Sequence, residues 1–402
     1  MRKIDLTNFQ VATSETARHI NRRIALNIIR RFQPLSRADL ARRSGLQRST
    51  VSAIVGQLIA EGWVTEGASP VSSRGRRPRF LHLNVERAGI VAVDLRPVTT
   101  RVGLAGLDAR FLMQTDWPTP GTPGEFAAEL ARTVAAFRSS HPEIVYEGMG
   151  VSLPGRADSS GRLVFAPNLH WEGVELRQLL EKAVGLPVAL ENAASACALA
   201  ALWFGHQADD VTHLVAVTVS EGIGVGMLVN GQLVHGRDSM AGEFGHVTLD
   251  ENGPPCSCGK RGCWERYASN SAAVRLYKEL TGDGALAEPP AAPGPSLSIT
   301  DILRLAEEGD GRAVKTLDHV ARYLGIGLAN IVTGLAPQVV IVVGEVTAAW
   351  DRVGPIVLEV VKRRTLPTNT TPIVPTDPAT QPRLRGAVTL VVQQHFGAPA
   401  VA

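Results

Sequence analysis

Close to Arg87 the spacing of apolar residues changes, and one folding unit does not accommodate both patterns. Before this point apolar side chains recur at the three- and four-residue intervals of amphipathic helices. Beyond it, apolar runs typical of buried strands, such as Gly89–Asp94 and Gln338–Val343, alternate with helical stretches. The chain of 402 residues also exceeds the roughly 100–200 residues of one ordinary domain. We therefore expect a small N-terminal unit followed by a larger α/β body.

Composition and the start of the chain bear on where the protein works. Hydrophobic residues make up 45% and charged residues 20%, the proportions of a globular protein. No apolar run approaches the roughly 20 residues that span a bilayer. The first ten residues show no apolar stretch followed by a small-residue cleavage site, so they do not resemble a secretory signal. We expect a cytoplasmic protein with no membrane partner.

Charge is divided unevenly along the chain. Residues 1–83 carry 15 Lys and Arg against 5 Asp and Glu, a net charge of +10. The remaining residues carry 26 basic against 33 acidic side chains, a net charge of −7. A basic segment of this kind suits nucleic acid, although charge alone is equally compatible with a solvated surface.

Two helices are expected at the start of the basic unit. The stretch Thr16–Phe32 has an apolar residue at every fourth position, which predicts an amphipathic helix. These apolar residues are Ile20, Ile24, Ile28 and Phe32. Ser36 and Asp39 then form a capping-box pattern for a short second helix. That helix is expected to end at Gly45, a residue suited to a positive φ in a tight turn.

A third helix, from about Gln47 to Ile59, completes helix-turn-helix spacing. Its inward residues are expected to be Val51, Ile54 and Leu58. The polar start of this helix is then free to meet base edges and phosphates. Two strands, 63–65 and 79–83, flank a Gly- and Pro-constrained loop that predicts a wing for the minor groove or the backbone. The predicted DNA contacts are Arg37, Gln47, Arg48, Ser49, Thr50, Ser52, Arg74, Arg76 and Arg77.

These features predict a winged helix-turn-helix domain over residues 1–83, all-helical apart from its wing, with double-stranded DNA as its partner. The alternative is a small helical packing module whose arginines are only solvated. Helix spacing, wing and charge agree with one another, and together they favour the DNA-binding interpretation.

Three of the four cysteines, Cys256, Cys258 and Cys263, fall within eight residues, and His246 lies ten positions upstream. Three thiolates and one imidazole suit tetrahedral zinc, and disulfides between such close cysteines are disfavoured in a reducing cytoplasm. We therefore expect these four residues to bind a structural Zn²⁺ ion. Cys197 lies in an Ala-rich apolar stretch and is expected to pack in the core.

Several segments of the body together resemble the ROK family of repressors, open-reading-frame proteins and sugar kinases. The resemblance covers nearly the whole chain, and the cysteine-rich segment is its most specific part. The segments that carry it are Leu153–Gly155, Ala166–Trp171, Glu191–Asn192, Gly242–His246 and Cys256–Glu265. It implies an α/β body of two actin/hexokinase-like, ribonuclease H-like lobes, and structural zinc bound through the matching His and Cys. We expect the first lobe at 88–206, completed by a C-terminal helix at 382–396, and the second lobe at 207–381.

The resemblance also implies a sugar site. The matching sugar-contact positions are Asn168, Asn192, Glu243, His246 and Glu265. Amides and carboxylates suit the many hydroxyls of a sugar, because directional hydrogen bonds compensate for their desolvation. His246 would direct one ring nitrogen to the zinc and the other to a hydroxyl. A lone Asn or Glu near a helix start is more often a cap, so the assignment depends on the combination.

Features that the family's kinases use for phosphoryl transfer look altered. The resemblance implies Glu-Asn-Asp around the base, but here Glu191–Asn192 precedes Ala193, which takes no proton. The kinases' first phosphate loop, Asp-x-Gly-Gly-Thr, is replaced by Asp94–Thr99, which contains Arg and Pro and lacks glycine. The end of the strand at Val343–Glu345 lacks a paired glycine, and Ser220–Gly226 is expected to be a tight strand turn. We therefore predict that the chain is not an enzyme.

A winged helix before such a body indicates the regulator branch of the family, which resembles repressors of sugar-uptake and sugar-use genes. We predict a repressor that binds a palindromic operator as a homodimer or tetramer and releases it on binding a sugar or sugar phosphate. The neutral Ala193 suggests, as a hypothesis, an acidic or phosphorylated sugar. Two alternatives stay open: a constitutive DNA-binding regulator without a sugar effector, and a sugar kinase with a DNA-binding appendage.

Overall fold

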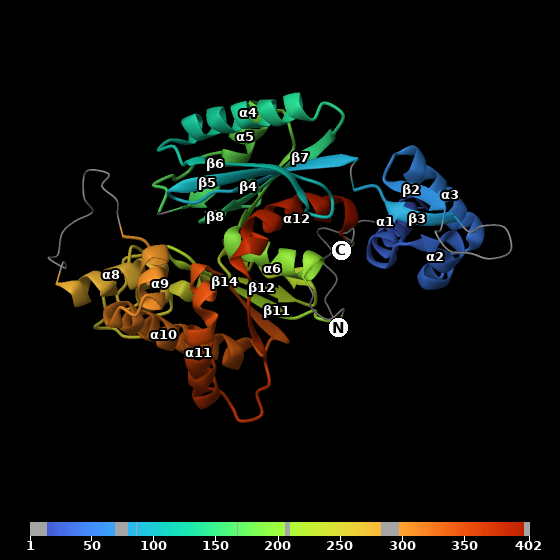
Figure 1. The fold of residues 1–402 in the computed structure, drawn as a ribbon. Helices are drawn as coiled ribbons and strands as arrows, with labels where there is room; N and C mark the ends of the chain where they lie inside the picture. The colour runs from blue at the N-terminus through green and yellow to red at the C-terminus, as the bar shows by residue number, and fades with distance from the viewer. Residues whose placement is uncertain are drawn as a thin grey trace.

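The computed structural model shows a small N-terminal domain beside a larger body of two α/β lobes (Figure 1). The described residues are 14–68, 79–85, 87–166, 168–205, 210–282 and 297–397. The predicted wing contacts Arg74, Arg76 and Arg77 lie outside them. No helix in the described part of the chain is long and apolar enough to cross a bilayer.

The N-terminal domain has the predicted helix-turn-helix. Its elements are α1 (Ser14–Phe32), β1 (Leu35–Ser36), α2 (Arg37–Ser44), α3 (Arg48–Ala60), β2 (Val64–Ala68) and β3 (Arg79–Leu83). The capping box forms as expected, because the Ser36 side chain accepts the Asp39 amide and the Asp39 carboxylate accepts the Ser36 amide at 3.0 Å. Gly45 ends α2 with a φ of 71°. The residues that α3 turns inward include Val51, Ile54 and Leu58, as predicted.

Two details of this domain differ from the prediction. The domain is not all-helical outside its wing, because β1 pairs with β3, with Leu35 opposite Leu81, and makes the sheet three-stranded. The fully buried residues of α1 are Ala25, Leu26 and Ile29, and Ile28 of the predicted stripe packs partly buried against the same core. Ile24 is instead 40% exposed and Phe32 37% exposed. A four-residue repeat drifts around a helix of 3.6 residues per turn, so the predicted stripe coincides with the buried face only in part.

The first lobe is built on a five-stranded sheet of order β10-β7-β4-β5-β6. Its strands are β4 (Ala88–Asp94), β5 (Thr99–Ala105), β6 (Phe111–Pro118), β7 (Val145–Leu153) and β10 (Val188–Asn192), and a small hairpin adds β8 (Arg156–Ala157) and β9 (Leu163–Phe165). Helices α4 (Pro123–Ser140) and α5 (Leu176–Val184) cover one face (Figure 1). β4 is apolar along nearly its whole length because the sheet is covered on both faces.

The second lobe repeats this strand arrangement as β13-β12-β11-β14-β15, with β11 antiparallel to β12 and parallel to β14. The strands are β11 (Leu214–Val219), β12 (Ile223–Val229), β13 (Gln232–Leu233), β14 (Val339–Gly344) and β15 (Ile373–Pro375). The other elements are η1 (Arg237–Ser239), η2 (Glu243–His246), α7 (Glu265–Ala268), α8 (Asn270–Thr281), α9 (Ile299–Glu307), α10 (Gly311–Leu335), η3 (Glu345–Ala349), α11 (Trp350–Arg364) and η4 (Pro378–Thr380). α10 and α11 share one apolar core with this sheet. The repeat is the expected pair of ribonuclease H-like lobes.

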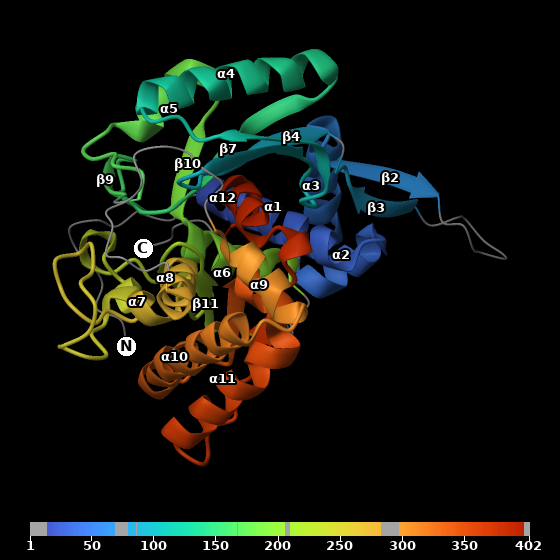
Figure 2. The same ribbon diagram turned by 60° about the vertical axis from the view of Figure 1, so that its left-hand side comes forward.

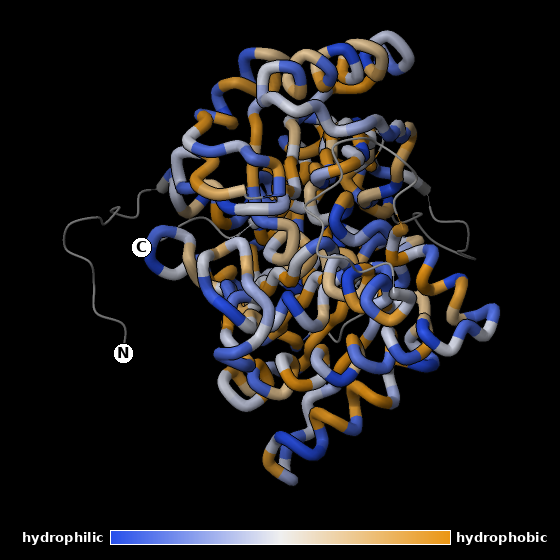
Figure 3. Tube along the Cα trace, turned by 90° about the vertical axis from the view of Figure 1, so that its left-hand side faces the viewer, coloured by the Kyte–Doolittle hydropathy of each residue, from blue (hydrophilic) through white to orange (hydrophobic). Residues whose placement is uncertain are grey.

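Two helices, α6 (Ala193–Phe204) and α12 (Pro382–Phe396), lie between the two sheets (Figures 1 and 2). α12 packs on β4 and β7 of the first sheet, whereas α6 packs on β11 and β12 of the second. The helices approach closely because Gly386 has no side chain; a Cβ there would lie 2.7 Å from the Ala196 carbonyl. Apolar segments concentrate inside the lobes (Figure 3). The two lobes therefore meet through this helix pair.

Candidate functional site

A cleft of about 850 Å³ is lined by residues from both lobes. All five predicted sugar contacts line it. From the first lobe come Asn168, in the exposed loop after β9, and Asn192, at the end of β10. From the second lobe come Glu243 and His246 in η2 and Glu265 at the start of α7. The fold thus collects donors and acceptors from distant parts of the sequence around one space.

Asn192 is held by hydrogen bonds at both ends of its amide. Its Nδ2 donates to the Gly155 carbonyl at 2.9 Å, and its Oδ1 accepts from the Ala194 amide at 2.8 Å. The second bond makes Asn192 the N-cap of α6. The same side chain therefore caps α6 and lines the cleft, and its amide is held in place by the start of α6 and the Gly155 carbonyl.

The four predicted metal ligands converge at the edge of the cleft. One ligand atom from each of His246, Cys256, Cys258 and Cys263 lies within 4.8 Å of the others. Cys256 Sγ is 3.5 Å from His246 Nδ1, and Cys258 Sγ is 3.6 Å from Cys263 Sγ. Burial, together with the Glu265 carboxylate, raises the pKa of the Cys256 thiol. A cation among these atoms would favour the thiolate, so the group fits a metal ion.

The His246 ring connects the cysteine group with the cleft. Its Nδ1 faces Cys256, and its Nε2 lies 3.9 Å from Glu243 Oε2. Glu265 Oε1 lies 3.5 Å from Nδ1 and 3.1 Å from Cys256 Sγ. A metal ion bound to Nδ1 would leave Nε2 free to face the cleft. This is the division between the two ring nitrogens that the family resemblance implied.

Among the polar residues of the cleft that sequence reasoning missed are Glu191 and His235. Glu191 Oε2 lies 3.8 Å from His235 Nδ1, and both residues line the cleft. Burial raises the pKa of Glu191, and the Asn192 amide and His235 only partly oppose this effect. Glu191 belongs to the Glu191–Asn192 segment that carries the family resemblance, so the sequence did indicate that it could lie near the site. Nothing around His235 in the sequence indicated that it would reach the cleft.

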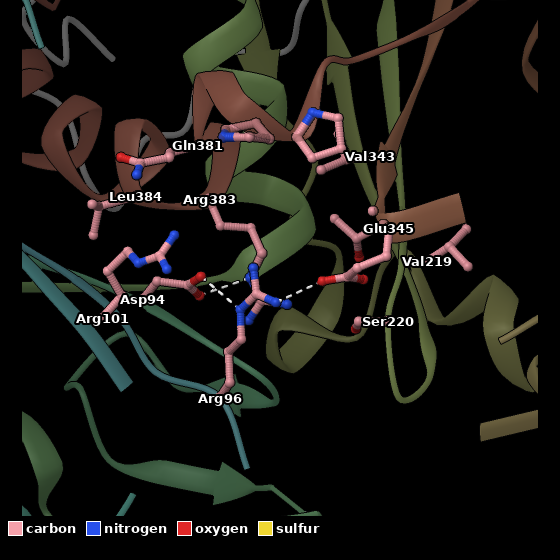
Figure 4. Close-up of a pocket in the computed structure, with 14 residues that line it drawn as sticks. Asp94, Arg96, Arg101, Val219, Ser220, Val343, Glu345, Gln381, Arg383 and Leu384 are labelled. Atoms are coloured by element: carbon pink, nitrogen blue, oxygen red, sulfur yellow. Dashed lines mark hydrogen bonds and ion pairs between the residues drawn. The ribbon is translucent and has the colours of Figure 1, made fainter. Parts of the chain in front are cut away.

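The two segments that depart from the kinase pattern meet between the lobes (Figure 4). Arg96 Nε donates to Asp94 Oδ2 at 2.8 Å, and Arg96 Nη1 donates to Glu345 Oε1 at 2.9 Å. Arg383 of α12 donates to the other Asp94 oxygen at 2.7 Å. Asn270 Nδ2 donates to Glu345 Oε2 at 2.9 Å. Arg96 and Glu345 thereby join the end of β4 in the first lobe to the end of β14 in the second.

This ion network fills the space between the strand ends. Burial alone would raise the pKa of Asp94, but the guanidinium groups of Arg383 and Arg96 outweigh it and hold that pKa below its ordinary value. The same balance between burial and Arg96 lowers the pKa of Glu345. The cavity that remains beside the network is about 50 Å³, against roughly 300–1,000 Å³ for common ligand pockets. Side chains therefore occupy most of this space.

The start of α3 presents most of the described DNA-contact candidates to solvent. Arg48, Ser49 and Ser52 are exposed and Thr50 is partly buried. Gln47 is the N-cap, and its exposed side chain makes no capping hydrogen bond. Arg37 lies differently, because it forms a two-point ion pair with Glu66 of β2 at 2.9 and 3.3 Å. Arg37 thereby joins α2 to β2. Its Nη1 also donates to the Ser52 carbonyl of α3 at 3.5 Å.

A helix-turn-helix domain in front of an actin/hexokinase-like body defines a transcriptional regulator built on a sugar-kinase fold. Comparison with known families agrees with this class. The ROK family profile matches residues 90–394, and a MarR family profile matches residues 21–75. The chain belongs to the ROK family.

Individual relatives extend the comparison. The xylose repressor of Bacillus subtilis (strain 168) is 34% identical over 82% of this chain and 83% of its own length. The DNA-binding transcriptional dual regulator NagC of Escherichia coli (strain K12) is 27% identical over 85% of this chain and 84% of its own.

Solved structures show the same architecture. A ROK family transcriptional regulator, described as a homolog of the E. coli Mlc protein, has a TM-score of 0.79 at 24% identity, covering 94% of this chain and 98% of its own. A ROK family glucokinase from Streptomyces griseus, in complex with glucose and AMPPNP, has a TM-score of 0.66 at 27% identity. It covers 75% of this chain and 98% of its own. The body fold is therefore common to regulators and kinases.

Proposed function

We propose that this protein is a sugar-responsive transcriptional repressor of carbohydrate uptake or metabolism genes. The observation that carries the proposal is the combination of a helix-turn-helix domain with an interlobe cleft lined by all five sugar-contact candidates. The likeness to the B. subtilis xylose repressor supports it. DNA is recognised by the start of α3, from Gln47 to Ser52, and by the wing arginines.

The sugar acts by shifting the balance between two arrangements of the lobes. Asn168 and Asn192 on one side of the cleft and Glu243, His246 and Glu265 on the other hydrogen-bond the hydroxyls of one sugar. Because a ligand held from both sides binds the closed arrangement more tightly, it changes the population of the two forms. The winged helices of a homodimer or tetramer then fit a palindromic operator in one form and not in the other.

We assign zinc as the metal ion of the His246 and cysteine group. His246 and the three clustered cysteines supply the ligand set that structural zinc prefers, and their side chains are close together. His246 and the three cysteines would hold the ion, which would fix the cysteine loop and the His246 ring. The other ring nitrogen of His246 would then be free to hydrogen-bond a sugar hydroxyl in the cleft.

The same geometry argues that the protein is not a sugar kinase. Ala193 lines the cleft where the kinase pattern has a carboxylate base, and the Arg96–Glu345 pair fills the space between the strand ends. The glucokinase likeness supports the fold of the body, while the sequence relatives named above are regulators. A coupled ADP-release assay across common hexoses is expected to show no turnover.

The proposal is tested by binding to DNA next to the protein's own gene. Fluorescence anisotropy with labelled duplexes from that region measures operator affinity alone and with xylose, glucose, glucosamine or N-acetylglucosamine, each free and as a phosphate. We expect specific binding that weakens about 5–150-fold with one member of the panel, the usual range of allosteric coupling. Sugar-insensitive binding would instead favour a constitutive regulator, and hexose-dependent ADP release a kinase.

The neutral Ala193 also leads to a prediction about the charge of the sugar effector. The kinase pattern has a carboxylate there, so the cleft has one negative charge fewer near the sugar; arginines such as Arg156 and Arg177 line it together with carboxylates such as Glu191 and Glu221. We therefore expect the phosphorylated or acidic form of the effector to bind more tightly than the neutral sugar. Calorimetry with each sugar and its 6-phosphate measures the difference. Equal or tighter binding of the neutral form contradicts this assignment.

A further inference from the structure

Helix α1 of the DNA-binding domain contacts both helices that lie between the lobes. Arg23 Nη1 donates to a backbone carbonyl just after α12 at 3.0 Å, and Asn27 donates to the last carbonyl of α12. Arg30 Nη1 donates to the Trp203 carbonyl near the end of α6 at 3.2 Å, and its guanidinium carbon lies 4.6 Å from the Trp203 ring centre. Steps of four and three residues place Arg23, Asn27 and Arg30 on one face of α1.

The two helices that α1 contacts pack on each other, but they lie on the sheets of different lobes. α12 lies on the first-lobe sheet, and α6 lies on the second-lobe sheet. If the lobes rotate against each other, the ends of α6 and α12 move relative to each other as well. α1 cannot keep both sets of contacts unchanged during such a movement, so it must shift, or one contact must break.

α6 also begins in the cleft. Asn192 caps its first turn and lines the cleft, while Trp203 lies near its other end. Twelve helical residues extend about 18 Å, so this one rigid element spans the distance from the sugar-contact candidate to α1.

On the first-lobe side the DNA-binding domain is anchored by a continuous apolar core. Leu26 and Ile29 of α1 are fully buried in that core together with Val392 and Phe396 of α12, whereas Trp203 and Phe204 of α6 pack against it only partly buried. Fully buried apolar contacts of this extent do not open in a small domain rotation. We therefore expect the attachment to α12 to stay fixed and the partly buried contact with the end of α6 to respond to lobe movement.

We propose that the contact between Arg30 and Trp203 transmits the state of the sugar cleft to the DNA-binding domain. The inference rests on the proposed function and adds the residues through which it is coupled. Closure of the cleft moves α6 with the second lobe, the Trp203 end of α6 displaces Arg30, and α1 carries the displacement to α2 and α3. Arg30 is a positioning residue in this scheme, since it does not line the cleft and is not among the predicted DNA contacts.

The environment of Arg30 suits a contact that forms and breaks. Among the described residues the Arg30 guanidinium donates to the Trp203 carbonyl, and its Nε is buried without a hydrogen-bond partner. A cavity of about 750 Å³ adjoins Arg30 and Trp203 and gives this end of α6 room to move. Glu191 and His235 line both that cavity and the sugar cleft, so the two spaces are neighbours at this point.

The test compares Arg30→Met with the wild type in operator binding, with and without the sugar of the panel that acts on the wild type. We expect Arg30→Met to bind that sugar normally by calorimetry and to bind the operator. The sugar should change its operator affinity by less than about twofold, instead of the wild type's expected 5–150-fold. Trp203→Leu, which removes the ring but keeps the helix, should weaken the response in the same direction.

Two controls separate coupling from structure and charge. Arg18→Met removes an exposed charge from the same helix, and Arg23→Met removes a contact of the same chemical kind to α12. Both should keep the wild-type response to sugar. A normal response in Arg30→Met, or an equal loss in Arg23→Met, overturns the inference while leaving the proposed function intact. A wild-type protein that responds to no sugar overturns the proposed function itself and the inference with it.

Discussion

Glu345 and Arg96 each depart from the kinase pattern, and together they form an ion pair between the lobes at 2.9 Å. Their side chains are 30% and 33% exposed, so solvent screens the pair only in part. An ionised residue that gains such a partner contributes to stability only while it keeps its charge. The difference in pH-dependent stability between the wild type and a Glu345 variant therefore reports on this pair.

Glu345→Gln is expected to lower the free energy of unfolding at neutral pH by about 1–2 kcal/mol, because a charge-assisted hydrogen bond is replaced by a neutral one. The folded pKa of Glu345 is depressed, so its contribution is present above the ordinary carboxyl pKa of about 4.3 and is lost as the pH falls below it. Denaturant titrations at pH 7 and pH 3 should show the difference shrinking. Glu172→Gln, which neutralises an exposed carboxylate outside this network, is the control. A difference that grows toward acid contradicts this account.

At the scale of elements, the crossing of α6 and α12 depends on a glycine. A Cβ at Gly386 would meet the Ala196 backbone at 2.7 Å, and backbone atoms in two packed helices have little freedom to yield. Gly386→Ala should therefore lower stability by about 1–3 kcal/mol in thermal or denaturant unfolding. Gly124→Ala in α4 is the matched control, because a Cβ there meets nothing within 4 Å. If the two variants unfold alike, the close crossing is unimportant for stability.

At the scale of the whole molecule, the candidate metal group lies in the second lobe and the DNA-binding surface in the N-terminal domain. Removing zinc should therefore weaken sugar binding, because His246 loses its orientation, while sugar-free operator binding persists. Metal analysis should find one zinc per chain in the wild type and none in Cys258→Ser. Cys197→Ala, which alters a thiol in the core between α6 and the second sheet, should keep the metal. A metal-free wild type that binds sugar normally contradicts the zinc assignment.

The molecule also divides into parts that the sequence could predict and parts that it could not. The capping box at Ser36, the left-handed Gly45 and the inward Val51 are local, because each depends on residues within a few positions. The His246 and cysteine ligands are close in sequence, and their donor chemistry limits what they can bind. The repeated strand order was expected from resemblance, since periodicity alone predicts elements but not their order.

Sequence by itself therefore determined the helix-turn-helix, the α/β body and the set of candidate ligands. Only the tertiary structure decided that Arg96 meets Glu345, 249 positions away, and that Arg30 meets Trp203, 173 positions away. It also decided which face of α1 is buried. The reason is physical: these contacts depend on how separately formed helices and sheets bury their apolar faces against one another, and neighbouring residues carry no information about that arrangement.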